Sequence, residues 1–226
     1  MSQAEMDQSE IKKGDTRPDT KQRILDAAEK LFAREGFHNT SLRAITGEAE
    51  VNLAAVNYHF GSKEALLDKV IARRLLPLNE LRRTRLLRVR EASRRENRRP
   101  RVEETLRAFI EPTMRFRDSE PGADDFMSLI GRALSEPDDT VRKIFITHIK
   151  SIFYLLYETL CNALPDISKE VIFWRLQFSI GALSHILRTV GRFELSHFPE
   201  GVNPAPDTDA MLTMLVPYLV QGMEAH

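Results

Sequence analysis

Two short helical patterns separated by a tight turn constrain this chain more than any other feature. The first spans residues 40–48 and opens with a pair of hydroxyl side chains, and the second spans residues 52–60 and opens with an asparagine. Ser, Thr and Asn are favoured at such positions because their side chains accept hydrogen bonds from the free amides of a first helical turn. The pattern therefore predicts two helices joined by a turn at residues 48–51.

A longer amphipathic helix precedes this pair and another follows it. Residues 20–35 carry apolar side chains at helical spacing, and a helix that begins at Ser62 contains Pro77, which is expected to kink it. A three-helix unit of this kind sets its last short helix into the major groove of DNA. We therefore expect a helix-turn-helix DNA-binding domain at residues 20–66, after a disordered polar tail at residues 1–19.

The remainder of the chain also has helical periodicity, and no convincing strand pattern occurs. Proline is expected to interrupt one of these helices at Pro112, because it cannot donate an amide hydrogen. The predicted fold class is all-α, with a small N-terminal domain and a larger C-terminal helical domain at residues 67–226. Helices of this larger domain are expected at about 102–117, 126–135, 139–163, 168–193 and 207–221.

The formal net charge is zero, but the charges are distributed unevenly. Residues 17–101 hold 20 Lys and Arg against 11 Asp and Glu, whereas residues 102–226 hold 11 against 18. A basic first half suits a surface that faces DNA phosphates, and chance clustering of solvated helix charges is the alternative explanation.

Other classes of site lack a signature in the sequence. The single cysteine, Cys161, excludes an internal disulfide and a cysteine-cluster metal site, and no glycine-rich phosphate loop, nucleophile elbow or metal-spaced histidines occur. The polar start of the chain lacks a secretory signal, and no apolar run reaches the length of a membrane span. We therefore expect a cytoplasmic protein with no enzymatic activity, cofactor, metal or membrane partner.

Positions spread over both short helices and the start of the next helix form one motif. They are Phe32, Gly36-Phe37, Thr40-Ser41-Leu42, Ile45, Ala49, Val51, Tyr58-His59-Phe60 and Ser62-Lys63-Glu64. With these residues, roughly positions 20–67 resemble the tetracycline-repressor (TetR) family of bacterial transcriptional regulators. Segments 56–63 and 77–79 are similar, more weakly, to a branch with fatty-acid-responsive and efflux-controlling members.

The resemblance implies a homodimeric repressor bound to a palindromic operator in double-stranded DNA. Its C-terminal domain is expected to serve ligand binding and dimerisation, and a small-molecule effector is expected to release the DNA. This effector is expected to be largely apolar, such as an acyl compound or an efflux substrate. A sequence-tolerant, ligand-free architectural DNA-binding protein is the alternative function, and an activator is the alternative to a repressor.

Five residues of the motif are suited to bind the DNA backbone. The hydroxyls of Thr40 and Ser41, with the amides at the start of their helix, form a site suited to a phosphate. Tyr58 and His59 lie at the end of the recognition helix, where both can donate to phosphate oxygens. Lys63 is expected in the first turn of the next helix. The helix dipole disfavours a cation at this position, and a bound phosphate would explain why one is present.

Base contacts are expected from four further residues, because Arg suits guanine, Asn suits adenine, and Leu or Ala can meet a thymine methyl. Asn57 stands where an aromatic residue is commoner in the family, and it is either an adenine contact or a solvent-facing amide. Asn52 is expected to cap its helix and to contact DNA only secondarily. The four candidates are Arg43, Leu53, Ala54 and Asn57.

The helices at 139–163 and 168–193 are each apolar on two sides and must be buried on two sides. In the family, two helices from each subunit form a four-helix bundle at the dimer interface, and we assign these two helices to it. A self-contained monomer core is the alternative. The expected interface residues are Ile152, Leu155, Leu156, Leu176, Ile180, Leu183 and Leu187.

A ligand pocket is expected between the other C-terminal helices and the inner faces of these two. Mixed Phe and Met side chains suit an apolar ligand of variable shape, although such residues also form ordinary cores. The candidate lining residues are Phe109, Met114, Phe116, Phe126, Met127, Ile130, Phe153, Trp174 and Phe178.

Arginines crowd residues 82–101. They form either a solvated helix face paired with Glu91 and Glu96, or a site near the pocket mouth for an anionic head group such as a carboxylate or a CoA phosphate.

Overall fold

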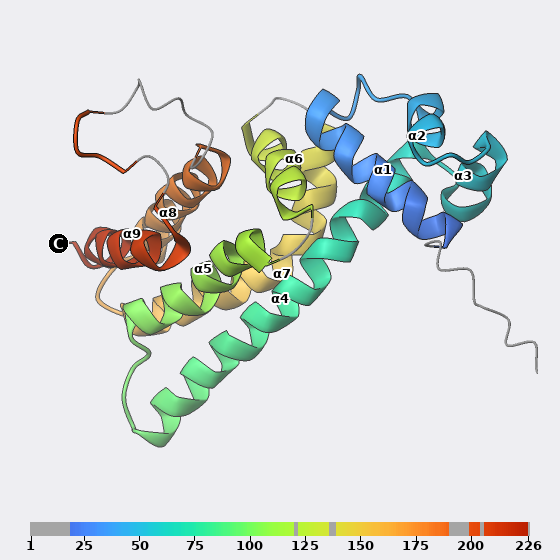
Figure 1. The fold of residues 1–226 in the computed structure, drawn as a ribbon. Helices are drawn as coiled ribbons and strands as arrows, with labels where there is room; N and C mark the ends of the chain where they lie inside the picture. The colour runs from blue at the N-terminus through green and yellow to red at the C-terminus, as the bar shows by residue number, and fades with distance from the viewer. Residues whose placement is uncertain (1–18, 120–121, 136–138, 190–198, 204–205, 226) are drawn as a thin grey trace, which may run out of the picture.

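The computed structural model describes residues 19–119, 122–135, 139–189, 199–203 and 206–225, and within them it contains helices and no strand. The expected all-α class is therefore confirmed (Figure 1). The expected tail at residues 1–19 lies, apart from Asp19, outside the described residues. The helices are α1 Thr20–Glu35, α2 Leu42–Glu48, α3 Leu53–Phe60, α4 Lys63–Arg95, α5 Val102–Ser119, α6 Ala123–Ser135, α7 Asp139–Ala163, α8 Lys169–Thr189 and α9 Thr208–Glu224.

Three prolines of the described residues sit inside helices without ending them, and they are Pro77 in α4, Pro112 in α5 and Pro217 in α9. Pro77 lies within α4, and α5 continues past Pro112, so the expected interruption of α5 is wrong. Each proline removes one amide hydrogen bond. Helix α5 packs against α4, α7 and α9, and this packing offsets the missing bond.

Apolar side chains gather in two cores, which we call the head core and the rear core. The head core joins α1, α2 and α3 to the first half of α4, and it also contains Phe126 of α6 and Phe145 of α7. The rear core joins the second half of α4 to α5, α7, α8 and α9. Figure 1 shows α6 lying beside α1, where the three-helix head meets the rest of the chain. The head is therefore packed against elements from far along the chain.

A buried carboxylate fastens α1 to α4 at this junction. The side chain of Glu29 is 4% exposed and accepts hydrogen bonds from Arg73 (2.7 Å) and Arg74 (2.8 Å). Gly122, just before α6, has a φ of 77°, and an added Cβ would lie 2.9 Å from Nη2 of Arg74. Only glycine suits this position, because other residues strain at positive φ and the Cβ would displace the ion pair.

Helix α7 is apolar enough to cross a membrane by length and composition, so the expectation that no segment reaches this threshold is wrong. The helix packs against α4, α5, α6 and α8 instead. A long core helix satisfies the same test of length and composition because it is buried on several sides.

Candidate nucleic-acid interface and ligand cavity

The predicted caps of α2 and α3 are present. Ser41 accepts a hydrogen bond from the amide of Ala44 (3.0 Å), and Asn52 accepts one from the amide of Ala55 (2.8 Å). The turn between the helices places Glu50 at a φ of 51°. These local bonds fix the angle between α2 and α3, which is the geometry that a helix-turn-helix requires.

Helix α3 presents its predicted contact residues to solvent. Leu53, Ala54 and Asn57 are exposed, and Tyr58 is 86% exposed beside half-buried His59. The two rings meet edge to face, with centroids 5.1 Å apart. This face of α3 therefore remains open to a partner.

The predicted phosphate-binding residues differ in their freedom. Thr40 is 1% exposed, and its hydroxyl donates to the carbonyl of Gly36 (2.8 Å), so its side chain is occupied inside the protein. Arg43, which is predicted as a base contact, is exposed on α2. Lys63 is half-buried, with Nζ 4.4 Å from the ring centroid of Phe37 and 3.4 Å from the His38 carbonyl oxygen. Thr40 is therefore left with only its backbone amide for a phosphate.

A cavity of about 710 Å³ lies among α4, α5, α6, α7 and α8. This volume is within the range of about 300–1,000 Å³ that is typical of small-molecule sites. Five of the predicted pocket residues line it. They are Phe109, Phe126, Met127, Ile130 and Phe153.

Four other predicted pocket residues lie elsewhere. Met114 is fully buried in the rear core, and Phe116 lines a separate, smaller cleft between α4 and α5. Trp174 and Phe178 are 54% and 70% exposed and do not line the cavity. These four residues do not line the cavity, and of the aromatic residues of α8 it is Phe173 that does.

The residues predicted for the dimer interface are used within the protomer. Ile152, Leu156 and Leu176 are buried in the rear core, and Leu155 is half-buried against it. The remaining three line the ligand cavity; they are Ile180, Leu183 and Leu187. Ile152, Leu156, Leu176 and Leu183 are buried within the protomer, whereas Leu155, Ile180 and Leu187 are partly exposed, so the assignment of these residues to a dimer interface stays a prediction.

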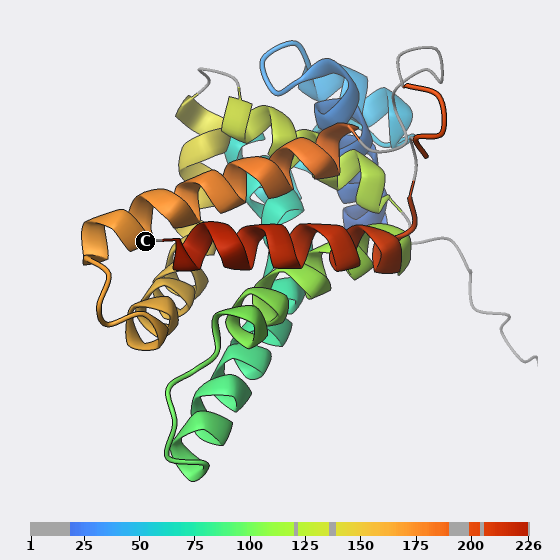
Figure 2. The same cartoon turned by 90° about the vertical axis from the view of Figure 1, so that its left-hand side faces the viewer.

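A different apolar face is exposed on α8 and α9, which lie side by side in Figure 2. Helix α8 exposes Val171, Trp174 and Phe178 along one side, and helix α9 exposes Met214 and Tyr218. We call these five residues the α8–α9 face. Large apolar side chains gathered on two adjacent helices are typical of a protein interface.

The cavity wall contains one buried cation, Arg82 of α4, which is 4% exposed. Its Nη1 donates to Oδ1 of Asn79 (2.8 Å) and its Nη2 to Oγ1 of Thr113 (2.6 Å). The guanidinium carbon lies 4.3 Å from the ring centroid of Phe109. Burial lowers the pKa of Arg82 to about 9, so the guanidinium still carries its charge at neutral pH.

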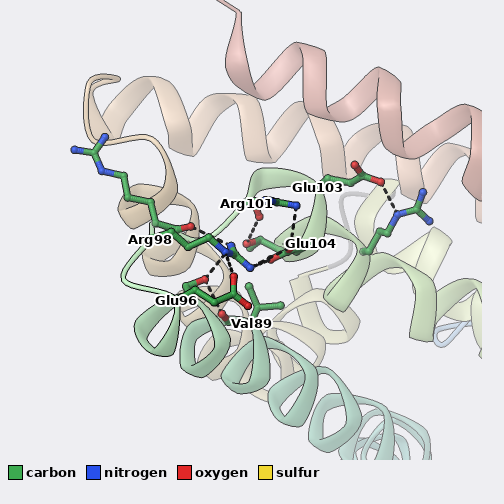
Figure 3. Close-up of polar contacts among 10 residues, drawn as sticks. Val89, Glu96, Arg98, Arg101, Glu103 and Glu104 are labelled. Carbon is green, nitrogen blue, oxygen red and sulfur yellow. Dashed lines mark hydrogen bonds and ion pairs between the residues drawn. The ribbon is translucent and has the colours of Figure 1, made fainter.

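The other arginines of the 82–101 cluster mostly face acids at the far end of α4. Figure 3 shows Arg98 between Glu96 and Glu104, and Arg95 pairs with Glu91 at 2.9 Å. The hydrogen bond from Arg98 lowers the pKa of Glu96. These contacts favour the solvated, ion-paired explanation for the cluster beyond Arg82.

Two family models match this chain. The model described as "Bacterial regulatory proteins, tetR family" matches residues 24–70, and "Tetracyclin repressor-like, C-terminal domain" matches residues 107–222, which is half of the chain. The chain belongs to the TetR family. Helix α3 lies within the segment that the first model covers, and the cavity is lined mostly by residues of the second segment, together with Leu75, Leu78 and Arg82 of α4 from outside both.

Curated relatives match over a short segment only. The transcriptional regulator UidR of Escherichia coli K12 is 40% identical over 52 residues, which are 23% of this chain and 26% of UidR. The nicotine-responsive repressor HdnoR of Paenarthrobacter nicotinovorans is 38% identical over 60 residues, which are 26% of this chain and 31% of HdnoR. The matches thus span about a quarter to a third of these relatives.

Solved structures of other regulators match over about nine-tenths of this chain. The fatty acid degradation regulator FadR of Bacillus halodurans has a TM-score of 0.65 at 16% identity, covering 93% of this chain and 99% of that chain. FadR of Bacillus subtilis, solved with stearoyl-CoA, has a TM-score of 0.64 at 15% identity, covering 89% and 98%. At these identities the likeness concerns the fold.

Proposed function

We propose that this TetR-family chain is a homodimeric cytoplasmic repressor, released from a palindromic operator by a largely apolar small molecule. One observation carries the proposal: residues of the head core also line the cavity. They are Leu75 and Leu78 of α4, Phe126 and Met127 of α6, and Phe145 of α7. A ligand in the cavity would touch side chains against which α1 packs.

This shared wall provides a route from ligand to DNA. A ligand that fits the cavity better when α4 and α6 move apart would favour that arrangement and tilt the head with them. A differential affinity of a few kcal/mol is enough to shift a two-state equilibrium decisively. The stearoyl-CoA bound by Bacillus subtilis FadR supports an apolar acyl ligand for this fold.

The α8–α9 face supports the homodimer, because a second copy would bury its five apolar side chains. Gly181 is exposed on α8, and a Cβ built there would meet nothing within 4 Å, so a partner helix has room to approach. A two-fold dimer presents two α3 helices, as reading a palindrome requires.

Selection of genomic DNA fragments on the purified protein tests the DNA function. We expect an inverted repeat shared by the retained fragments, and retention without a shared motif would favour the architectural alternative. On the selected operator, Tyr58→Phe should weaken binding about 3- to 10-fold for every sequence, since it removes one phosphate contact. Asn57→Ala should instead change the preference at one base position.

Sedimentation of a matched pair of variants tests the dimer. Phe178→Glu places a charge on the α8–α9 face and should yield monomers that bind the operator weakly. Leu87→Glu alters an exposed leucine on α4, far from this face, and should leave the dimer intact. Dimers that withstand Phe178→Glu and Trp174→Glu would refute this interface.

A further inference from the structure

Arg82 is a buried charge that no acid neutralises within the described residues. Among the residues that the structure describes, the neutral side chains of Asn79 and Thr113 are its hydrogen-bond partners, and its Nε has none. Burial lowers its pKa to about 9. A buried cation without an anionic partner is costly, so its retention on a cavity wall calls for an explanation.

The two neutral partners are held so that they present oxygens to Arg82. Asn79 donates through Nδ2 to the carbonyl of His148 (3.0 Å), which leaves Oδ1 facing the guanidinium. Thr113 donates its hydroxyl proton to the carbonyl of Phe109 (3.1 Å) and accepts from Arg82. The guanidinium is thus fixed in position by contacts from α4 and α5, and α7 holds Asn79 in turn, while no carboxylate of the described residues pairs with its charge.

The rest of the cavity selects for an apolar body. The lining residues are mostly aliphatic and aromatic, and none of those that the structure describes is acidic. The other charged lining residue is also a cation, Lys150, which is exposed on α7. An anion entering this site would meet an attractive potential and an apolar surround that strengthens it.

We propose that the effector is an apolar molecule bearing one carboxylate, and that Arg82 binds this carboxylate inside the cavity. The proposal rests on the proposed function of the cavity as the effector site. A guanidinium offers five N–H donors in a planar fork that matches a carboxylate. In Arg82, Nη1 and Nη2 each donate to one neutral oxygen, and Nε has no partner among the described residues. A single buried cation suits a single negative charge, which disfavours the multiply charged head of a CoA thioester.

Binding of matched probes to the delipidated dimer tests the proposal. Displacement of Nile red, a neutral dye, would report the affinities of dodecanoate, methyl dodecanoate and dodecanoyl-CoA. We expect the acid to bind wild-type protein at least about 10-fold more tightly than its methyl ester, because only the acid forms a charge-assisted pair. In Arg82→Met this preference should fall to near unity while the ester still binds.

Lys150→Met is the matched control, because it removes the other cation of the lining from an exposed position. It should change the ratio of acid to ester affinity by less than about 3-fold. If Arg82→Met still binds the ester, its cavity is folded. If Arg82→Met does not bind the ester, Arg82→Gln is the second variant to measure.

Three outcomes would overturn the assignment of Arg82. They are equal affinity of acid and ester for wild-type protein, an acid preference that survives in both Arg82 variants, and a CoA thioester that binds more tightly than the acid. Binding of none of the probes would also overturn it, together with the proposed apolar ligand. Operator binding by the same preparation, measured in parallel, shows whether the DNA function fails as well.

Discussion

Removing the buried carboxylate of Glu29 should destabilise the protein far more than removing an exposed one. Glu29→Ala deletes the acceptor of hydrogen bonds from both Arg73 and Arg74, whose side chains are only 18% and 15% exposed. Breaking a buried ion pair from one side costs about 3–5 kcal/mol. Arg73 keeps a second acid, Asp26 at 2.6 Å, so we expect the lower end, about 3 kcal/mol.

For a chain of this size, about 3 kcal/mol lowers the melting temperature by about 6–12 °C. Thermal unfolding followed by circular dichroism, at one fixed protein concentration, measures this shift. Glu48→Ala is the matched control: it removes the acid of the exposed Lys30–Glu48 pair in the same head and should leave the melting temperature unchanged. Equal melting temperatures for the two variants would refute the view that the Glu29 network holds α1 against α4.

Three further changes probe the head and its link to α7. Asn52→Ala removes the cap of α3 and should cost about 1 kcal/mol of unfolding free energy, measured by urea titration against the wild type. Lys63→Ala should reduce the dependence of log operator affinity on log salt by about 1, and an unchanged slope would remove Lys63 from the phosphate contacts. Asp68 is partly desolvated, which raises its pKa, but hydrogen bonds from His148 (2.8 Å) and Lys69 outweigh this and lower it. A carboxyl whose pKa is lowered by folding stabilises the folded protein above its unfolded pKa of about 4, and this stabilisation is lost as the pH falls through the folded pKa. Asp68→Asn should therefore flatten the dependence of the unfolding free energy on pH below about pH 4.

The elements of the head could be predicted from the sequence because their signals are local. Ser41 and Asn52 cap helices whose amides lie three residues away, and Gly61, which follows α3, takes a positive φ as its position after a helix suggests. Each signal involves neighbours in sequence, so one window of residues contains the whole interaction.

The faces of the C-terminal helices could not be predicted in the same way. Periodicity showed that α7 and α8 are apolar on two sides, but it does not tell which side meets the same protomer. Phe178 and Leu176 are equally apolar in the sequence, yet Phe178 is exposed and Leu176 is buried. In the sequence, Arg82 could not be distinguished from the other arginines around it. Thr113, and the His148 carbonyl that holds Asn79, come close to it only in the folded chain.

The shared head core limits how freely such regulators can be recombined. A chimeric sensor that joins this head to another effector domain just after residue 66 would leave Phe32 and its neighbours without the α6 and α7 side chains of their core. New residues at Phe126 and Phe145 would have to fill the same volume to about one methylene group. A graft that carries α6 and the start of α7 with the head therefore has the better prospect of folding.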